Sequence, residues 1–427
     1  MKLAVVGAGW SGLSCAVEAV RAGHEVTVFE ASRMLGGRAR RVDDPDGGPS
    51  LDNGQHILIG AYRETLAMMR TVGVDPASTL SRLPLSLRFS DGAGLALPSW
   101  PAPFHLLAGI ATARGWTARD KWSLIFTAMQ WRGAGFRCDP SATVGRLCSG
   151  LSPRVMQELI EPLCVSALNT PVGRAGGQVF LRVLSDALFG EAGSADLLLP
   201  RVDLGRLFPD AAWGWLARNG AELHRGIRVR EVCATRSGSW RIDELAFDRV
   251  VLAVGAQDAV RLVRTTLDAR TTQKPAESHL AERWASAAEA LDFEPIATVY
   301  LTGATALDAP MVALRSSTDA PAQFAFDRGQ LGAGPGSLAM VVSACDPDRD
   351  ALQEKVIRQA HDQLHQKQLK LVRTIVEKRA TFACTAGLAR PPMHIAPGLV
   401  ACGDYVDGPY PATLEGAVRN GIAAAAE

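Results

Sequence analysis

A glycine-rich stretch near the start of the chain has the spacing that binds the diphosphate of a dinucleotide. Gly7, Gly9 and Gly12 form a GxGxxG pattern directly after a short apolar run. The first glycine permits a tight turn, the second lets the backbone approach a diphosphate, and the third lets a helix pack closely on a strand. The start of that helix offers N–H groups and a positive dipole end to the phosphates. We therefore expect a dinucleotide site here, with Ala8 and Ser11 as further contacts.

An acidic residue completes this pattern at the distance that dinucleotide-binding folds use. Glu30 lies eighteen residues beyond Gly12 (30 − 12) and ends the β-rich run 25–29. A carboxylate in that position can accept hydrogen bonds from ribose hydroxyls. A GxGxxG pattern alone is weak, but strand, helix, second strand and terminal acid in register indicate a βαβ unit. The pattern does not distinguish NAD from FAD.

The segment after Glu30 carries a basic residue suited to a phosphate. Gly36, Gly37 and Arg38 form a GGR sequence, in which the two glycines let the chain pass close to a ligand. Arg38 presents a forked donor that matches phosphate oxygens. Beside a GxGxxG pattern we favour that contact over a solvated arginine. We expect Ala31, Gly37 and Arg38 to contact the cofactor.

A polar turn follows, and it leads into an apolar strand and then a helix over about 62–72. Its residues Asn53, Gly54, Gln55 and His56 gather polar groups around a glycine, which is unusual for a structural turn. His56 alone fits a hydrogen-bonded structural histidine at least as well as a functional one.

The last thirty residues combine a buried strand, a glycine and an acid. Gly403 and Asp404 end an apolar run, a turn-rich loop follows, and the alanine- and glycine-rich residues 412–425 predict a helix. Leu414 lies at the start of that helix, where the positive dipole end can meet a ligand.

Length and composition set limits on the fold and its partners. The chain has 427 residues, of which 47% are hydrophobic, so it can bury a large core and we expect two domains. The net charge is +1 without a basic block, which argues against a nucleic acid partner. The eight cysteines include no CxxC pair, so we expect no metal site and no disulfide scaffold, as in a reducing cytoplasm. The N-terminal apolar run is short and broken by glycine, so we expect no signal peptide.

These motifs together resemble a large superfamily of FAD enzymes that contains the amine oxidases and the phytoene desaturases. GxGxxG, Glu30 and GGR resemble its start, and nicotinamide dehydrogenases do not usually carry GGR. The segments LDNGQHILIGAYRETL (51–66) and GDYVDGPYPATLEGAVRNG (403–421) are very similar to hydroxysqualene dehydroxylases, also called squalene-associated FAD-dependent desaturases. A mild departure is Cys402, where small residues such as alanine are usual. The resemblance is strong at both ends of the chain and loose in the middle.

The resemblance implies an α/β protein with FAD as cofactor. It implies a glutathione-reductase-type, Rossmann-like FAD-binding domain with an inserted α+β substrate domain. The FAD-binding domain would combine 1–80, 205–265 and 395–427, and the substrate domain would combine 81–204 and 266–394.

The same resemblance implies where the parts of FAD lie. A three-stranded meander beginning with the strand 227–232 would cross the adenine, with Val229 packed beside it. The loop 53–56 would lie near the isoalloxazine and Asp404 near the ribityl–phosphate region. The start of the last helix would stabilise the reduced flavin.

The activity that the resemblance implies is FAD-dependent reductive dehydroxylation of hydroxysqualene to squalene, in squalene and hopanoid biosynthesis. An acid would assist the loss of water from the allylic carbinol, and flavin N5 would deliver a hydride. Candidate acids near the ring are His56, Tyr405, Asp407 and Tyr410. Alternatives are a carotenoid-type desaturase, a flavin amine oxidase, and a flavoprotein that carries an isoprenoid or serves as a scaffold. An amine oxidase usually has an aromatic cage, for which four tyrosines are limited material.

An apolar region after residue 97 suggests contact with a membrane. Its prolines at 98, 101 and 103 and the following Arg114 exclude a spanning helix. Within a helix predicted over 117–131, one face carries apolar side chains at spacings of three and four, which fits core packing or a bilayer interface. These side chains are Trp122, Ile125, Phe126 and Met129, and the proposed tryptophan anchors are Trp100, Trp116, Trp122 and Trp131.

The resembling family handles a C30 isoprenoid, and that favours the membrane interpretation. We expect peripheral contact at the cytoplasmic, inner face of the membrane. The expected functional partners are enzymes that form hydroxysqualene from farnesyl diphosphate.

Overall fold

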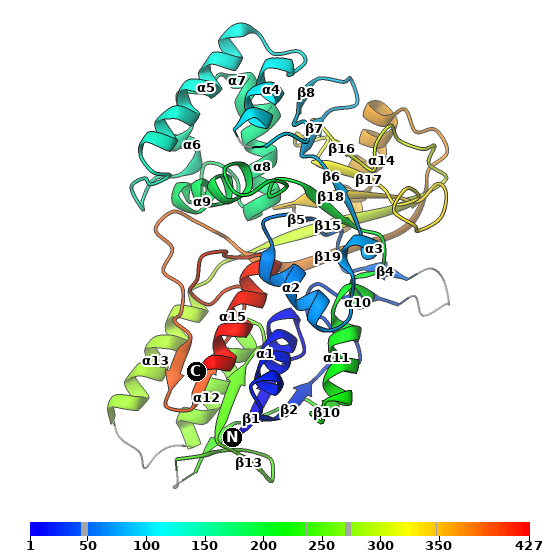
Figure 1. Cartoon of the computed structure of the whole chain (residues 1–427). Helices are drawn as coiled ribbons and strands as arrows, with labels where there is room; N and C mark the ends of the chain where they lie inside the picture. The colour runs from blue at the N-terminus through cyan, green and yellow to red at the C-terminus, as the bar shows by residue number, and fades with distance from the viewer. Residues whose placement is uncertain (44–49, 102, 236–237, 270–274, 347) are drawn as a thin grey trace.

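The computed structural model of the chain describes all residues except 44–49, 102, 236–237, 270–274 and 347. The side chains of residues 267–278 also lie outside the described part. Figure 1 shows two lobes, of which one contains both chain ends and the other contains the helices α4 to α9.

A mainly parallel sheet forms the centre of the lobe that holds the chain ends. Its strands, in spatial order, are β10 (Glu222–Arg225), β2 (Glu25–Glu30), β1 (Lys2–Val6), β14 (Arg249–Leu252), β21 (Leu399–Ala401) and β20 (His394–Ala396). The first five are parallel, and β20 pairs antiparallel with β21. Parallel neighbours need crossover connections, and the helix α1 (Trp10–Arg21) supplies the first of them. The first and last segments of the chain therefore meet in one sheet.

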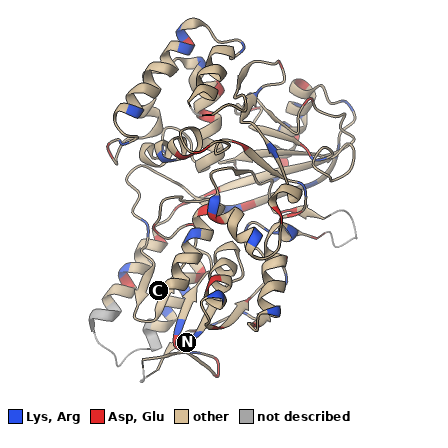
Figure 2. Cartoon of the chain, in the orientation of Figure 1, with Lys and Arg blue, Asp and Glu red and all other residues tan. Residues whose placement is uncertain are grey.

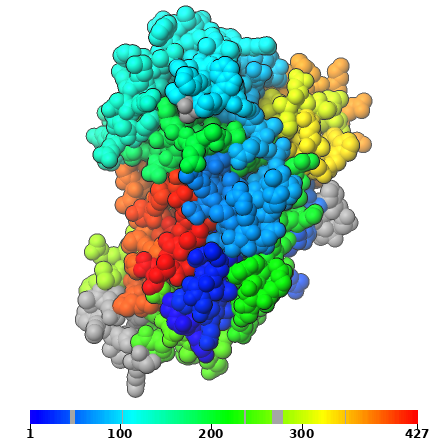
Figure 3. All heavy atoms as spheres, in the orientation of Figure 1, coloured from blue at the N-terminus to red at the C-terminus, as the bar shows by residue number. Residues whose placement is uncertain are grey.

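Helix α1 packs against the last helix, α15 (Leu414–Ala426), and against α11 (Pro209–Arg218). The first and last segments of the chain also lie side by side on the surface in Figure 3. A Cβ atom on Gly421 would overlap the carbonyl oxygen of Ser11, and one on Gly12 would overlap that of Gly7. Glycine is required at both positions because backbone approaches backbone there.

A small antiparallel meander lies beside this sheet, but it does not use the strand that the sequence predicts at 227–232. The meander consists of β11 (Cys233–Ala234), β12 (Trp240–Ile242) and β13 (Leu245–Phe247). Residues 227–232 form no strand, although the Ile227 N–H donates to the Glu30 carbonyl at 2.9 Å, and 249–252 belong to the central sheet as β14. The alternation of arginine and valine suggested a strand, yet its burial comes from packing of Val229 and Val232 without a neighbouring strand.

The second lobe is built on an antiparallel sheet of long strands. In spatial order these are β16 (Met311–Ala313), β17 (Phe324–Asp327), β18 (Leu338–Ser343), β15 (Phe293–Thr302) and β19 (Lys370–Phe382). Helix α14 (Arg349–Leu364) packs on one face of this sheet. The remaining helices of the lobe are α4 (Phe104–Thr112), α5 (Ala118–Gly133), α6 (Val144–Leu147), α7 (Pro153–Val155), η1 (Met156–Ile160), α8 (Glu161–Leu168) and α9 (Gly177–Leu188).

The remaining short elements lie between the lobes or at the edge of the second lobe. They are β3 (Arg41–Val42), β4 (Leu51–Asp52), β5 (Leu58–Ile59), α2 (Arg63–Thr71), α3 (Pro76–Thr79), β6 (Leu80–Leu83), β7 (Ser86–Arg88), β8 (Gly94–Ala96), β9 (Leu197–Pro200) and α10 (Leu204–Leu207). Helices α12 (Ala256–Ala269) and α13 (Pro275–Glu289) pack on each other, and the Trp284 indole donates to the Pro392 carbonyl at 2.6 Å, close to β20. The domain limits expected from the sequence stay a prediction.

Two of the four proposed tryptophan anchors are core residues. Trp116 and Trp131 are only 7% and 8% exposed, and the Trp116 indole donates to Glu158 Oε2 at 2.8 Å. Trp131 lies nine residues beyond Trp122 (131 − 122), which turns it to the opposite side of α5 at about 100° per residue. Trp100 and Trp122 are exposed, as the interpretation requires.

Candidate functional site

A cavity of about 600 Å³ lies between the loops at the carboxyl ends of the central strands and the antiparallel sheet of the other lobe. That volume is within the usual range of ligand pockets, about 300–1,000 Å³. Fifteen of the seventeen positions predicted to contact the cofactor line it: Gly7, Gly9, Ser11, Glu30, Ala31, Gly37, Arg38, Asn53, Gly54, Gln55, His56, Val229, Gly403, Asp404 and Leu414. Ala8 and Gly12 are absent from the described lining. The Ala8 N–H donates to the Glu30 carboxylate, and Gly12 allows the close approach of the Gly7 carbonyl.

Glu30 fixes the loop that follows the first strand. Its Oε2 accepts from the Ala8 N–H at 2.6 Å, and its Oε1 accepts from the Ser32 N–H at 2.7 Å. Each carboxylate oxygen has a second lone pair, so Glu30 can still accept from a ribose hydroxyl. The acid thus shapes the loop as well as facing the cavity.

Two hydroxyl groups on the cavity wall have no protein partner among the described residues. Ser11 Oγ and Tyr405 Oη are both buried, and both residues line the cavity. A buried hydroxyl without a hydrogen bond costs about 1–3 kcal/mol. Ser11 also stands in the first turn of α1, where the helix dipole favours an anion. This arrangement fits a ligand that brings phosphate or hydroxyl oxygens, as the diphosphate and ribityl parts of FAD do.

Arg38 joins three segments at the cavity. Its guanidinium donates to the Asp404 carboxylate, and its Nη1 donates to the Ala380 carbonyl at 2.8 Å. The side chain remains 36% exposed. Arg38 would therefore contact a phosphate while it is also paired with Asp404. The sequence alone does not predict this ion pair.

The polar turn is held so that His56 presents one ring nitrogen. Gly54 has φ +152°, and its carbonyl lies 2.8 Å from His56 Nδ1. A carbonyl can only accept, so Nδ1 carries the proton and Nε2 is the free acceptor of the neutral ring. Burial lowers the pKa of His56, and the nearby Arg38 guanidinium acts in the same direction.

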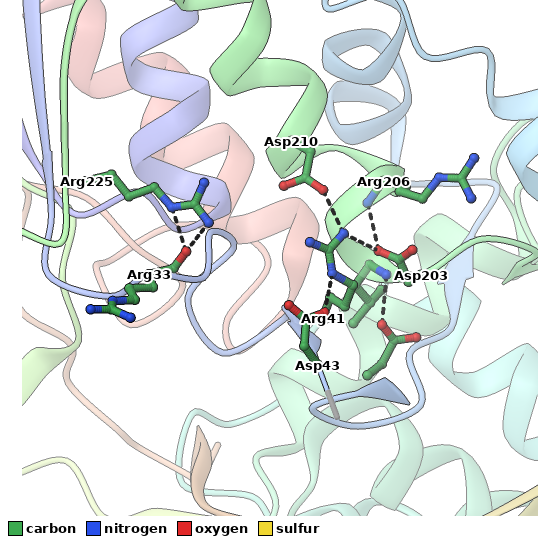
Figure 4. Close-up of polar contacts among 9 residues, drawn as sticks. Arg33, Arg41, Asp43, Asp203, Arg206, Asp210 and Arg225 are labelled. Carbon is green, nitrogen blue, oxygen red and sulfur yellow. Dashed lines mark hydrogen bonds and ion pairs between the residues drawn. The ribbon is translucent and has the colours of Figure 1, made fainter. Parts of the chain in front are cut away.

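Asn53 and the preceding Asp52 hold this turn in place through hydrogen bonds to other segments. Asn53 Nδ2 donates to Glu377 Oε2 at 2.8 Å, and Asp52 Oδ1 accepts from the Leu204 N–H at 2.8 Å. Burial raises the pKa of Asp52 to about 6. Figure 4 shows the adjacent cluster in which Arg41 bridges Asp43, Asp203 and Asp210, and this cluster fixes β3 to the start of α10 and α11.

The start of α15 forms another part of the wall. Leu414 lines the cavity, and the Thr413 hydroxyl caps the helix by accepting from the Gly416 N–H at 3.0 Å. Fully buried Glu415 accepts from the Thr65 N–H at 3.0 Å, the Thr65 hydroxyl at 2.8 Å and Arg419 Nε at 2.7 Å. The carboxylate thus joins the starts of α15 and α2, a long-range role that the sequence pattern did not reveal.

Only two of the four candidate acids line the cavity. His56 and Tyr405 do, whereas Asp407 and Tyr410 are absent from its described lining. Asp407 pairs with Arg390 at 3.2 Å, and the Tyr410 hydroxyl donates to Asp186 Oδ2 at 2.6 Å.

A backbone hydrogen bond closes the loop that contains those two residues. The Ala412 N–H donates to the Asp404 carbonyl at 3.2 Å, and within this loop Tyr405 lines the cavity while Asp407 and Tyr410 are absent from the described lining. The roles of Asp407 and Tyr410 as acids therefore stay predictions, for residues outside the described lining.

The part of the cavity beyond His56 is mainly apolar. Its side chains come from β15, β17, β18 and α8: Phe293, Ile296, Phe324, Phe326, Val341, Val165 and Ala167. Asn169 ends α8 with φ +44°, and its amide is satisfied by Thr381 Oγ1 at 3.0 Å and the Ala344 N–H at 2.8 Å. The sequence alone does not show which faces of these strands line the cavity.

Comparisons with known proteins agree with this geometry. The family model described as flavin containing amine oxidoreductase matches residues 10–427. The chain is 27% identical over 449 residues to a protein of Sinorhizobium fredii named hydroxysqualene dehydroxylase, covering 99% of this chain and 96% of the relative. A relative of the same name from Zymomonas mobilis is 24% identical over 440 residues, covering 99% and 97%.

A solved structure shows the same fold. An oxidoreductase from Methanosarcina mazei superposes with a TM-score of 0.72 at 17% identity, over 100% of both chains. Together with the parallel sheet, this likeness confirms the predicted Rossmann-like α/β class.

Proposed function

The chain belongs to the flavin containing amine oxidoreductase family, and on that premise we propose that it reduces hydroxysqualene to squalene with loss of water. It is an FAD-dependent oxidoreductase. The names of the relatives that match over nearly its full length support the choice of substrate.

The observation that carries the proposal is the apolar chamber that adjoins the His56 turn. Aromatic and aliphatic side chains of β15, β17, β18 and α8 line the same cavity as the His56 turn, and polar residues of β19 such as Glu377 and Thr381 line it as well. A C30 allylic alcohol has a long hydrocarbon body and a single hydroxyl, and such a chamber matches that distribution. The substrate hydroxyl would then lie at the His56 end.

The reaction replaces a hydroxyl by a hydrogen, so a hydride and a proton enter and water leaves. FAD in its reduced form supplies the hydride when it is bound. The protein must exclude bulk water, hold the carbinol carbon in place and deliver a proton to the leaving oxygen.

His56 is the residue that we assign to the proton. Its ring lines the cavity, and its Nδ1 is already engaged with the Gly54 carbonyl, which leaves Nε2 to carry a proton toward substrate. Burial lowers the pKa of His56, so its protonated form is a stronger acid than an exposed imidazolium.

Product analysis tests the proposal. The FAD-loaded protein, reduced chemically, is given hydroxysqualene or phytoene, and the extracted lipids are separated and identified. We expect squalene from hydroxysqualene, and no product from phytoene with either reduced or oxidised protein. Desaturation of phytoene by the oxidised protein, with hydroxysqualene unchanged, would overturn the proposal in favour of a carotenoid-type desaturase. Oxidation of an amine instead would favour an amine oxidase.

The proposed activity implies a place in the cell and in a reaction sequence. Both substrate and product partition into membranes, so we place the protein at the cytoplasmic, inner face of the membrane. Enzymes that form hydroxysqualene from farnesyl diphosphate would supply the substrate, and hopanoid synthesis would consume the squalene.

A further inference from the structure

Exposed apolar side chains gather on α4, α5 and the segment before them. Figure 1 places these two helices at the end of the molecule farthest from the chain termini. Trp122, Phe126 and Met129 are 68%, 65% and 66% exposed and follow one another at spacings of four and three along α5. Half of the twelve exposed large apolar side chains in the described part of the chain lie here: Trp100, Phe104, Leu107, Trp122, Phe126 and Met129. We call these six residues the α4–α5 surface.

Folding of the lobe does not require this apolar face. Helix α5 buries its other side through Leu124, Thr127 and Trp131. A solvent-facing side of such a helix usually carries charged residues, and a contiguous exposed apolar patch marks an interaction site. The α4–α5 surface is therefore a candidate interaction site.

The charge around the surface indicates which kind of partner would bind there. Residues 98–137 contain five basic residues and one acidic residue, a net charge of +4 (5 − 1) against +1 for the whole chain. The acid, Asp120, is buried and accepts from the Thr117 hydroxyl at 2.7 Å in the cap of α5. Figure 2 shows Lys and Arg on the helices at this end. The basic residues are Arg114, Arg119, Lys121, Arg132 and Arg137.

We propose that the α4–α5 surface docks on an anionic lipid bilayer, with its aromatic side chains in the interface and its basic rim on the headgroups. Exposed tryptophan with flanking arginine is the composition that interfacial helices use. A second copy of the chain would place like charges opposite one another, which disfavours that occupant. Among the described residues, no helix is long and apolar enough to cross the bilayer.

A second feature connects the docked surface to the site. An apolar cavity of about 40 Å³ lies under α4 and α5, lined by Leu106, Leu124 and Leu163 among others. Leu163 belongs to α8, and the following residues 165–167 of that helix line the large cavity. Helix α8 thus contributes side chains to both cavities, and we infer that a hydrocarbon chain from the bilayer enters along this helix. This route rests on the proposed function, whereas the docking does not.

Vesicle binding tests the docking. The FAD-loaded protein is sedimented with vesicles of phosphatidylcholine alone or mixed with phosphatidylglycerol, at low and high salt. We expect binding to the anionic vesicles that weakens with salt, and about a tenfold loss for the double variant Trp122→Gln/Phe126→Gln. The control Leu280→Gln changes an exposed apolar residue on α13 and should bind like the wild type.

Three outcomes would overturn the docking. They are an absence of binding to anionic vesicles, equal binding by the double variant, and a dimer in solution that the double variant abolishes. Melting temperature and bound flavin absorbance show that the variants are folded.

Turnover separates the docking from the proposed function. With hydroxysqualene in detergent micelles, the double variant should match the wild type, and with the substrate in anionic vesicles it should be slower by about tenfold. An equal rate in vesicles would overturn the route. If neither protein turns over hydroxysqualene in either form, the proposed function fails, while the vesicle-binding result still decides the docking.

Discussion

The polar residues around the cavity differ in whether the protein itself satisfies them. Glu30, Asp52 and Glu415 all accept hydrogen bonds from backbone amides, so their carboxylates hold loops and helix starts in place. Ser11 and Tyr405 have hydroxyls without a partner among the described residues. Since unsatisfied buried hydroxyls are costly, these two are the side chains that most need the cofactor.

Tyr405 should therefore bind the cofactor rather than donate a proton. Burial raises the pKa of its phenol, so it stays a neutral hydrogen-bond donor. Tyr405→Phe should weaken FAD binding by about tenfold, equivalent to about 1.4 kcal/mol, in a fluorescence titration of the apoprotein. Tyr410→Phe, outside the described lining, is the matched control and should bind FAD like the wild type. Unchanged affinity in Tyr405→Phe would refute the assignment.

The role of His56 predicts a pH dependence. The pKa of His56 is lowered from its usual value of 6.5, so the protonated acid is scarce at neutral pH. The rate of squalene formation should rise as the pH falls and level off below that lowered pKa. His56→Gln should reduce the rate by about 10²–10⁴-fold and remove the pH dependence. A variant with the same pH profile as the wild type would exclude His56 as the proton donor.

Asp52 predicts a pH dependence of stability. Its pKa is raised from 3.8 to about 6, so the folded state holds the proton more tightly than the unfolded state does. The contribution of Asp52 to stability is therefore full below about pH 4 and is lost as the pH rises through 6. Asp52→Asn should remove this pH dependence of the unfolding free energy, which amounts to up to about 3 kcal/mol between those two pH values. An unchanged slope in urea unfolding across this pH range would show that Asp52 is not the cause.

At the scale of elements, the FAD half of the cavity depends on the close contact of α1 with α15. A Cβ atom on Gly421 would overlap the Ser11 carbonyl oxygen, so Gly421→Ala must push the two helices apart. We expect a loss of about 1–3 kcal/mol in unfolding free energy together with weaker FAD binding. Gly133→Ala, on α5 with nothing within 4 Å of the added atom, is the control and should be neutral or slightly stabilising. Equal stability of both variants would contradict the packing argument.

The sequence predicts the elements with local signatures and fails where distant contacts decide. The spacing of Gly7, Gly9, Gly12 and Glu30 reflects a local turn, helix and strand, so it correctly predicted β1, α1 and β2. The segment 227–232 has a strand-like alternation, but no neighbouring strand pairs with it. A strand depends on its partner, and a single sequence does not specify that partner.

The direction of side chains in the site likewise depends on contacts that a local sequence pattern does not show. The loop after Asp404 offers three polar candidates, of which Tyr405 lines the cavity and Asp407 and Tyr410 are absent from its described lining, and nothing in the local pattern distinguishes them. The link between Glu415 and Thr65 spans 350 residues and leaves no pattern in either segment. Site positions on glycine motifs could therefore be predicted, whereas the roles of loop side chains could not.

At the scale of the whole molecule, the two lobes contribute different chemistry to one cavity. The central sheet and its loops present glycines, acids and helix starts, while β15, β17, β18 and α8 present most of the apolar side chains and β19 adds polar ones such as Glu377. The α4–α5 surface lies at the far end of the second lobe. The cofactor-binding lobe, the proposed substrate chamber and the proposed membrane face therefore follow one another along the molecule.

The central claim is that the bound flavin passes its electrons to hydroxysqualene. In an anaerobic stopped-flow experiment, the reduced FAD-loaded protein is mixed with hydroxysqualene, and the absorbance of oxidised flavin is followed. We predict that this absorbance returns in proportion to the squalene formed, and that phytoene or a simple amine leaves the flavin reduced. A flavin that stays reduced with hydroxysqualene, in protein that reoxidises normally in air, would contradict the proposed function.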